Sequence, residues 1–139
     1  MIHITLARYL DSLGIVTYDE AGGDGNCFTG PLPPEPDLAI SIRQYGGSGD
    51  FQHAYDTPRI QVRVRAAIGD QALAKAEEIY EALHSLRYQT LDKGGDAEAQ
   101  MVYCRALDLP SDMGMDENSR QEYVTNYEVE HKVASANRE

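Results

Sequence analysis

Hydrophobic and polar side chains alternate strictly between residues 58 and 66. The apolar positions are Ile60, Val62, Val64 and Ala66, and the polar positions between them are Gln61, Arg63 and Arg65. A period of two residues is typical of a β-strand with one buried face and one face in water. The pattern therefore predicts a strand over 58–65 that carries Arg63 and Arg65 on its solvent-exposed face.

Two other segments repeat at helical spacing. The first, over about residues 2–13, has apolar side chains at Ile2, Leu6, Tyr9, Leu10 and Leu13, and Gly14 stands where a helix commonly stops. The second begins at Asp70, which we expect to be the N-cap. Its buried stripe is predicted to be Leu73, Ala76, Tyr80, Leu83 and Leu86, and its polar face to carry Lys75, Glu77, Glu78 and Glu81.

Four further segments have strand-like patterns, at residues 15–18, 37–43, 101–109 and 122–129. A proline-rich connector, residues 31–36, precedes the second of them. Residues 44–57 and 110–118 are predicted to be long mobile loops, and the chain is expected to fray after about residue 133. The order of elements predicts a single α+β domain over 1–139, with an antiparallel or mixed sheet of about five to six strands covered on one face by two main helices.

Charge and length narrow the class of protein. The chain has 139 residues and a formal net charge of −11, which argues against affinity for nucleic acid or anionic membranes. No apolar run reaches the length of a membrane span, and the first residues lack a signal-peptide pattern, so we expect synthesis in the cytoplasm. Cys27 and Cys104 are predicted to be small apolar core residues, with a disulfide as the less favoured alternative.

No motif predicts catalysis or a bound cofactor. The glycine-rich segment 22–25 lacks the phosphate-loop pattern, and the oxygen-bearing residues around Asp19 and Asp24 lack the spacing of a calcium loop. The four histidines, His3, His53, His84 and His131, have no zinc-site spacing. We therefore expect a protein that is not an enzyme and has no catalytic residue, metal or cofactor.

Exposed charge suggests surfaces for other proteins. Arg63 and Arg65 allow two interpretations: a solvated strand face with cross-strand partners such as Glu128, or a contact with an acidic neighbouring subunit. The acidic helix face would be a natural counterpart, and the two long loops could become ordered against the next subunit. The candidate interface residues are therefore Arg63, Arg65, Glu77, Glu81, Asp50 and Met113.

Several short sequence segments, taken in order, resemble those of a known family. They are LARYL at residues 6–10, GIVTY at 14–18, FTG at 28–30 before the connector, YDTPRIQVRVR at 55–65, AEEIYEALH at 76–84 and DENSRQEYVTNYEV at 116–129. Together they resemble the small minor capsid proteins of tailed bacteriophages, a group similar to the tail terminator and tail completion proteins. The resemblance covers residues 6 to 129.

The resemblance implies a tail-terminator-like fold and a structural role in the virion, in the tail or neck. Terminators form a homo-oligomeric ring, usually a hexamer, that caps the tail tube and docks to the head connector. The implied partners are other copies of the chain, the major tail tube protein and the head-completion or connector protein, while DNA passes through an acidic lumen without specific binding. A head-completion or neck adaptor protein or a minor capsid protein is the alternative; a small ligand-binding domain or enzyme is a remote one.

Overall fold

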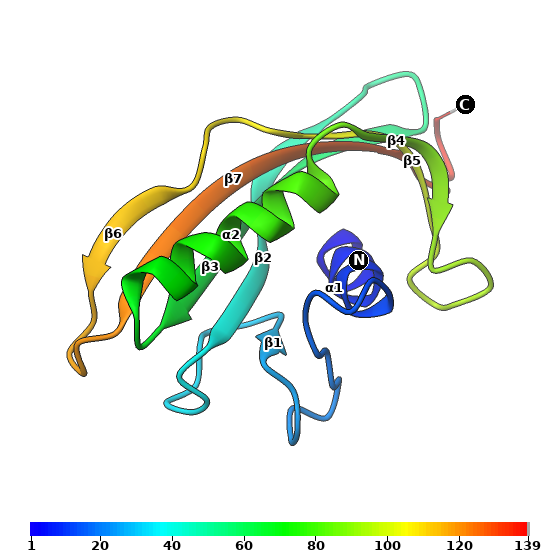
Figure 1. Cartoon of the computed structure of the whole chain (residues 1–139). Helices are drawn as coiled ribbons and strands as arrows, with labels where there is room; N and C mark the ends of the chain where they lie inside the picture. The colour runs from blue at the N-terminus through cyan, green and yellow to red at the C-terminus, as the bar shows by residue number, and fades with distance from the viewer. Residues whose placement is uncertain (139) are drawn as a thin grey trace.

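The computed structural model describes residues 1–138, which form two helices and seven strands (Figure 1). The predicted first helix is confirmed, and so are the strands beginning near residues 37, 58, 101 and 122. In chain order the elements are α1 (Ile2–Ser12), β1 (Cys27–Phe28), β2 (Ala39–Gly49), β3 (Tyr55–Ala66), α2 (Gly69–Leu83), β4 (Leu86–Leu91), β5 (Ala99–Ala106), β6 (Ser111–Met115) and β7 (Gln121–Lys132).

The seven strands form one mixed sheet, in the order β1-β2-β3-β7-β5-β4, with β6 also paired to β7. Among the pairs of named strands, β1 with β2 is parallel and the others are antiparallel. The sheet curls, and both helices lie on its concave side (Figure 1). The predicted α+β class, with a mixed sheet and two helices, is confirmed.

The core lies between the concave side of the sheet and the two helices. The strict alternation along β3 turns Ile60, Val62 and Val64 inward, and all three are buried. They pack in one cluster with β7, α1 and α2, to which the main contributors are Tyr127, Val129, Leu6, Leu10, Ile79 and Leu83. Burial of these side chains is the main force that holds the helices in the curled sheet.

Helix α2 differs from the prediction at its start and in its buried stripe. The N-cap is Ile68, and Asp70 lies inside the first turn without a capping hydrogen bond. Ala72, Ala76, Ile79 and Leu83 are buried, whereas Leu73 and Tyr80 are partly exposed. The stripe passes through Ile79 because that side of α2 packs against β3, β5 and β7, and a helical period alone does not fix which side of a helix meets the sheet. Leu86 begins β4, a strand that the sequence pattern did not predict.

Three loop or strand predictions are wrong. Residues 15–18 form no strand, and only a bridge from Tyr18 to Cys27 is made there. The segment 44–57 is mostly strand, because β2 and β3 continue as a long hairpin and leave only 50–54 as the turn. The register shifts between Gln44 and Gly46, as in a β-bulge. Just beyond it the close hairpin requires a glycine at 47, where φ is +120° and a Cβ would lie 2.3 Å from the Thr57 carbonyl oxygen.

The other predicted loop, 110–118, contains strand β6. After β7, residues 133–138 have no helix or strand, as expected for the chain end. They are nevertheless tied to the hairpin, because the Val133 amide donates to the Ala54 carbonyl at 2.9 Å. The Arg138 guanidinium also lies 2.8 Å from the Asp56 carboxylate. The last residue of the predicted frayed end, 139, is outside the described residues.

Candidate subunit-interaction surfaces

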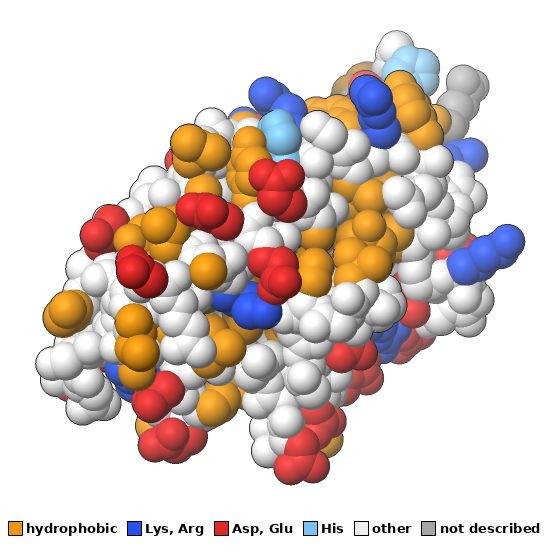
Figure 2. All heavy atoms as spheres, in the orientation of Figure 1, with side chains coloured by type: hydrophobic (Ala, Val, Ile, Leu, Met, Phe, Trp, Pro, Cys, Tyr) orange, Lys and Arg blue, Asp and Glu red, His pale blue; other side chains and the backbone are white. Residues whose placement is uncertain are grey.

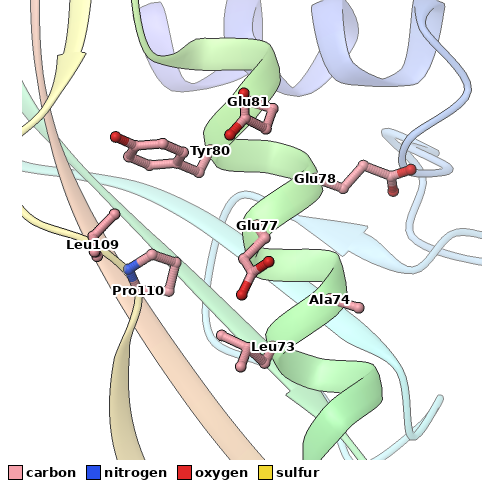
Figure 3. A pocket seen from close by; sticks show the side chains of 8 residues that line it. All are labelled: Leu73, Ala74, Glu77, Glu78, Tyr80, Glu81, Leu109 and Pro110. Atoms are coloured by element: carbon pink, nitrogen blue, oxygen red, sulfur yellow. The ribbon is translucent and has the colours of Figure 1, made fainter.

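A groove runs between the outer side of α2 and the segment that leads into β6. Leu73 and Tyr80 project from the helix toward Leu109 and Pro110 (Figure 3). The groove has a volume of about 560 Å³, and its lining is completed by Ala74, Glu77, Glu78 and Glu81. An apolar floor with carboxylates at its edge is suited to a partner that presents apolar and basic groups.

Strand β6 continues this surface as an exposed edge. Strands β5 and β6 pair with successive parts of one edge of β7, and all five residues of β6 are exposed. Leu109, Met113 and Met115 are 67%, 54% and 70% exposed. Figure 2 shows hydrophobic and acidic side chains interleaved over this side of the molecule. Exposed apolar side chains beside an unpaired strand edge are typical of a protein-binding surface.

We refer to the groove together with β6 as the α2–β6 face. It brings three of the predicted interface residues onto one surface: Glu77 and Glu81 line the groove, and Met113 lies on the strand that continues from Pro110. Neither glutamate forms an ion pair within residues 1–138. The sequence pattern predicts a loop at residues 110–118 and so does not place Met113 on a strand edge.

The convex side of the sheet carries the arginines. Arg63 and Glu122 lie on paired strands, and Arg63 Nη1 is 2.5 Å from the carboxylate. Arg63 therefore has a cross-strand partner, which is Glu122 and not Glu128. Glu128 instead accepts from Arg105, at 3.1 Å, and pairs with Arg59, also at 3.1 Å.

On the convex side, the Glu128 carboxylate has three side-chain partners, Tyr103, Arg105 and Arg59. The hydroxyl of Tyr103 donates to Oε1 at 2.7 Å, and this bond is the largest cause that holds the pKa of Glu128 below its usual value. The hydrogen bond from Arg105 lowers that pKa further. The ionised form of Glu128 is thus favoured in the folded protein.

Arg65 does not lie on a solvent-exposed face, so that expectation is wrong. Its side chain is covered by the proline-rich connector, and the residue is only 3% exposed. Nη2 donates to the Pro36 carbonyl at 2.6 Å, and Nε donates weakly to the Asp37 carbonyl at 3.4 Å. Burial, and secondarily the nearby charge of Arg120, lowers the pKa of Arg65.

Asp50 is separate from the α2–β6 face. It lies in the turn of the β2–β3 hairpin, on the opposite side of the molecule from β6 (Figure 1). Its carboxylate accepts from the Gln52 and His53 amides, at 2.8 and 2.9 Å, and these bonds lower its pKa. Its neighbour Phe51 is 93% exposed. The hairpin turn is therefore a second place where a large apolar side chain is exposed, and the hydrogen bonds of Asp50 hold the turn in its conformation.

Other kinds of site have little support within residues 1–138. Groups of three or more His, Cys, Asp or Glu that could hold a metal ion do not occur there, and none of its helices has the length and apolarity to cross a membrane. Cys27 and Cys104 are free thiols in the core, and burial raises the pKa of each to about 12. Both therefore act as apolar core residues, as predicted.

In a small α+β domain, an exposed apolar strand edge is typical of proteins that assemble with others. The family model described as "Bacteriophage tail terminator protein" matches residues 9–132. The chain belongs to this family and is a structural protein of the phage virion.

The fold has a counterpart among solved structures. A chain in the structure titled "Virion of native gene transfer agent (GTA) particle" superposes with a TM-score of 0.59 and 14% identity, over 78% of this chain and 79% of that chain. At this identity the likeness concerns the fold alone. No curated protein matches the sequence.

Proposed function

We propose that the protein is a tail terminator subunit, several copies of which form a ring that caps the completed tail tube and provides the docking surface for the head connector. The α2–β6 face is the observation that carries this proposal. A protein that acts as a monomer does not need an unpaired strand edge with Leu109, Met113 and Met115 exposed beside it.

The ring contact is proposed to be head to tail. The α2–β6 face of one copy would pack against a different surface of the next copy, since a contact between two unlike surfaces generates a ring when the rotation closes. Six copies are proposed, as is usual in the terminators that the chain resembles. Burial of the groove and of β6 would supply the apolar centre of the contact.

The remaining surfaces are proposed to meet the other parts of the virion. The tail tube protein would contact one side of the ring and the head-completion or connector protein the other. The net charge of −11 would give the lumen a potential that repels DNA phosphates, so that the genome passes through without binding.

The test is electron microscopy of particles made when this gene carries a stop codon. Filled heads beside unjoined tails of irregular or excessive length are expected, because nothing would stop tube growth. A plasmid copy of the wild-type gene is the control and should restore joined particles. Tails of normal length beside leaking heads would transfer the protein to the head side of the joint, and finished infectious particles would refute the structural role.

A further inference from the structure

A second hollow, on the convex side of the sheet, has a charge opposite to that of the whole chain. It lies where the proline-rich connector crosses β2, β3 and β7, and its volume is about 290 Å³. Its lining residues are Pro31, Leu32, Ser41, Arg43, Gln61, Arg63, Arg65 and Glu122. We call this hollow the arginine pocket. Three guanidinium groups and one carboxylate line it, in a protein with 23 acidic and 12 basic residues.

The single carboxylate does not neutralise the pocket. Glu122 is bound by Arg63 at 2.5 Å, which leaves Arg43 and Arg65 without a carboxylate. Within residues 1–138 neither of these two arginines forms an ion pair. The pocket therefore carries an excess of two positive charges.

Arg65 has donor hydrogens to spare for an anionic group. A guanidinium has five donor hydrogens, and the carbonyl oxygens of Pro36 and Asp37 bind only Nη2 and Nε. A charged group that is 97% covered is normally paired with an opposite charge, because burial of a lone charge is costly. Here the carboxylates of the surroundings lie beyond ion-pair distance, and Arg120 adds a like charge nearby.

The chemistry of the lining defines the ligand. Guanidinium groups bind carboxylates through paired, charge-assisted hydrogen bonds. Pro31 and Leu32 add an apolar wall, which suits the methylene groups of a glutamate side chain. Carboxylates of this kind are abundant on the chain itself: Glu77 and Glu81 are exposed on α2 and have no ion-pair partner within the described residues.

We propose that the arginine pocket of one copy binds the α2 carboxylates, Glu77 and Glu81, of a second copy. This inference rests on the proposed ring, and it identifies the surface that receives the α2–β6 face. The two surfaces lie on opposite sides of the curled sheet, α2 on the concave side and the pocket on the convex side. They can therefore meet head to tail and leave each copy free to bind a neighbour on both sides.

The pocket can be tested without assembly. Glutarate, whose two carboxylates and methylene chain stand in for the pair of glutamates on α2, is titrated at low salt while the Nε–Hε signals of the arginines are followed by NMR. We expect the signals of Arg43, Arg63 and Arg65 to shift along one saturating curve. Arg43→Gln should weaken the affinity about tenfold or more, as expected when a charge-assisted partner is lost.

Arg87 provides the matched control, because it is exposed on a strand and forms no ion pair within residues 1–138. Arg87→Gln should bind glutarate as the wild type does. Equal, non-saturating shifts at all arginines would overturn the proposal. Saturation by inorganic phosphate but not by glutarate would also overturn it, since the ligand would then be a phosphate and not a side chain.

The contact between copies is tested by charge exchange in assembling particles. Arg43→Glu and Glu77→Arg should each cause a loss of joined particles, and the two changes combined in one chain should restore them. Arg87→Glu is the control. Normal particles with Arg43→Glu, or no restoration by the double variant, would overturn this inference while the stop-codon phenotype still supported the terminator role. Normal particles in the stop-codon strain would remove the proposed function itself.

Discussion

Arg65 on β3 fastens the connector through Pro36: its Nη2 donates to the Pro36 carbonyl oxygen at 2.6 Å. The bond joins residues that are 29 positions apart in the chain, and the Arg65 side chain that makes it is buried. A second arginine acts in parallel, since Arg120 Nη1 donates to the Pro34 carbonyl at 2.5 Å. Because prolines provide no amide donors, these carbonyls are bound by side-chain donors, from Arg65 on β3 and from Arg120, which directly precedes β7.

Arg65→Met should loosen the connector. The change keeps much of the side-chain volume but leaves the Pro36 carbonyl without its donor, and the removal of an unpaired buried charge offsets part of that cost. We therefore expect a net loss of about 1 kcal/mol in the free energy of unfolding. Urea denaturation measures the loss, and hydrogen exchange should become faster at residues 28–32 and 37–41. Arg87→Met, at an exposed strand position, is the control. Unchanged exchange next to the connector would show that Arg65 does not hold it.

Tyr127→Phe should not destabilise the fold. Tyr127 is fully buried, and within residues 1–138 its hydroxyl makes no hydrogen bond; burial, followed by the nearby Cys104, raises its pKa. Removing a buried group that makes no bond should leave the free energy of unfolding unchanged or raise it by up to about 1 kcal/mol, whereas Tyr127→Ala should lose about 3–5 kcal/mol. Thermal and urea unfolding measure both changes.

Tyr103→Phe is the comparison for that prediction, since the hydroxyl of Tyr103 donates a hydrogen bond to Glu128 at 2.7 Å. This variant should be less stable than the wild type by about 1 kcal/mol. A larger loss for Tyr127→Phe than for Tyr103→Phe would mean that the buried Tyr127 hydroxyl has a partner.

Glu128 should contribute a distinct acid sensitivity. Its pKa is lower in the folded protein than the ordinary value of 4.5. Its stabilising effect is therefore complete above that value and is lost as the pH falls through the lowered pKa of the folded state. The difference in unfolding free energy between the wild type and Glu128→Gln should shrink between about pH 6 and pH 3.

Glu130→Gln is the control for this measurement, because Glu130 is on the same strand but forms no ion pair within residues 1–138. Its difference from the wild type should vary less with pH. If the two variants lost stability in parallel, the acid sensitivity would come from elsewhere in the sheet.

Met113→Asp should separate assembly from folding. The side chain is 54% exposed on β6, so the fold should change by less than about 0.5 kcal/mol. A charge at the proposed interface should nevertheless reduce the number of joined particles seen by microscopy. Tyr88→Asp, at a position on β4 that is 80% exposed, is the control. Equal effects of the two substitutions on assembly would remove β6 from the contact.

The elements that the sequence predicted have a pattern that can be recognised locally. The two-residue period of β3 and the helical period of α1 each repeat more than twice within the element. Each element could therefore be identified without its neighbours. Strands β4 and β6 have no such pattern: the interior of β4 is exposed, and β6 is exposed throughout. Both exist because β5 and β7 offer them a free edge, and pairing partners cannot be identified from a short segment.

The candidate interface residues also divide into those that local periodicity places correctly and those whose surroundings come from distant parts of the chain. Glu77 and Glu81 were found because a polar helix face is visible in the periodicity, and they are exposed as expected. Arg65 was misplaced because the period of two can say that a residue faces away from the core but not that another segment covers that face. The groove was missed because its two sides, on α2 and at Leu109 and Pro110, are about thirty residues apart in the chain.

The sequence by itself determined the α+β class, the two amphipathic helices, the central strands and the resemblance to tail terminators, since each depends on side chains close together in the chain. Only the tertiary structure decided which acidic partner Arg63 takes, that the proline-rich connector covers Arg65, and that Met113 lies on an exposed strand edge. These features depend on how the sheet curls and brings distant segments together, because burial and ion pairing depend on distances in space.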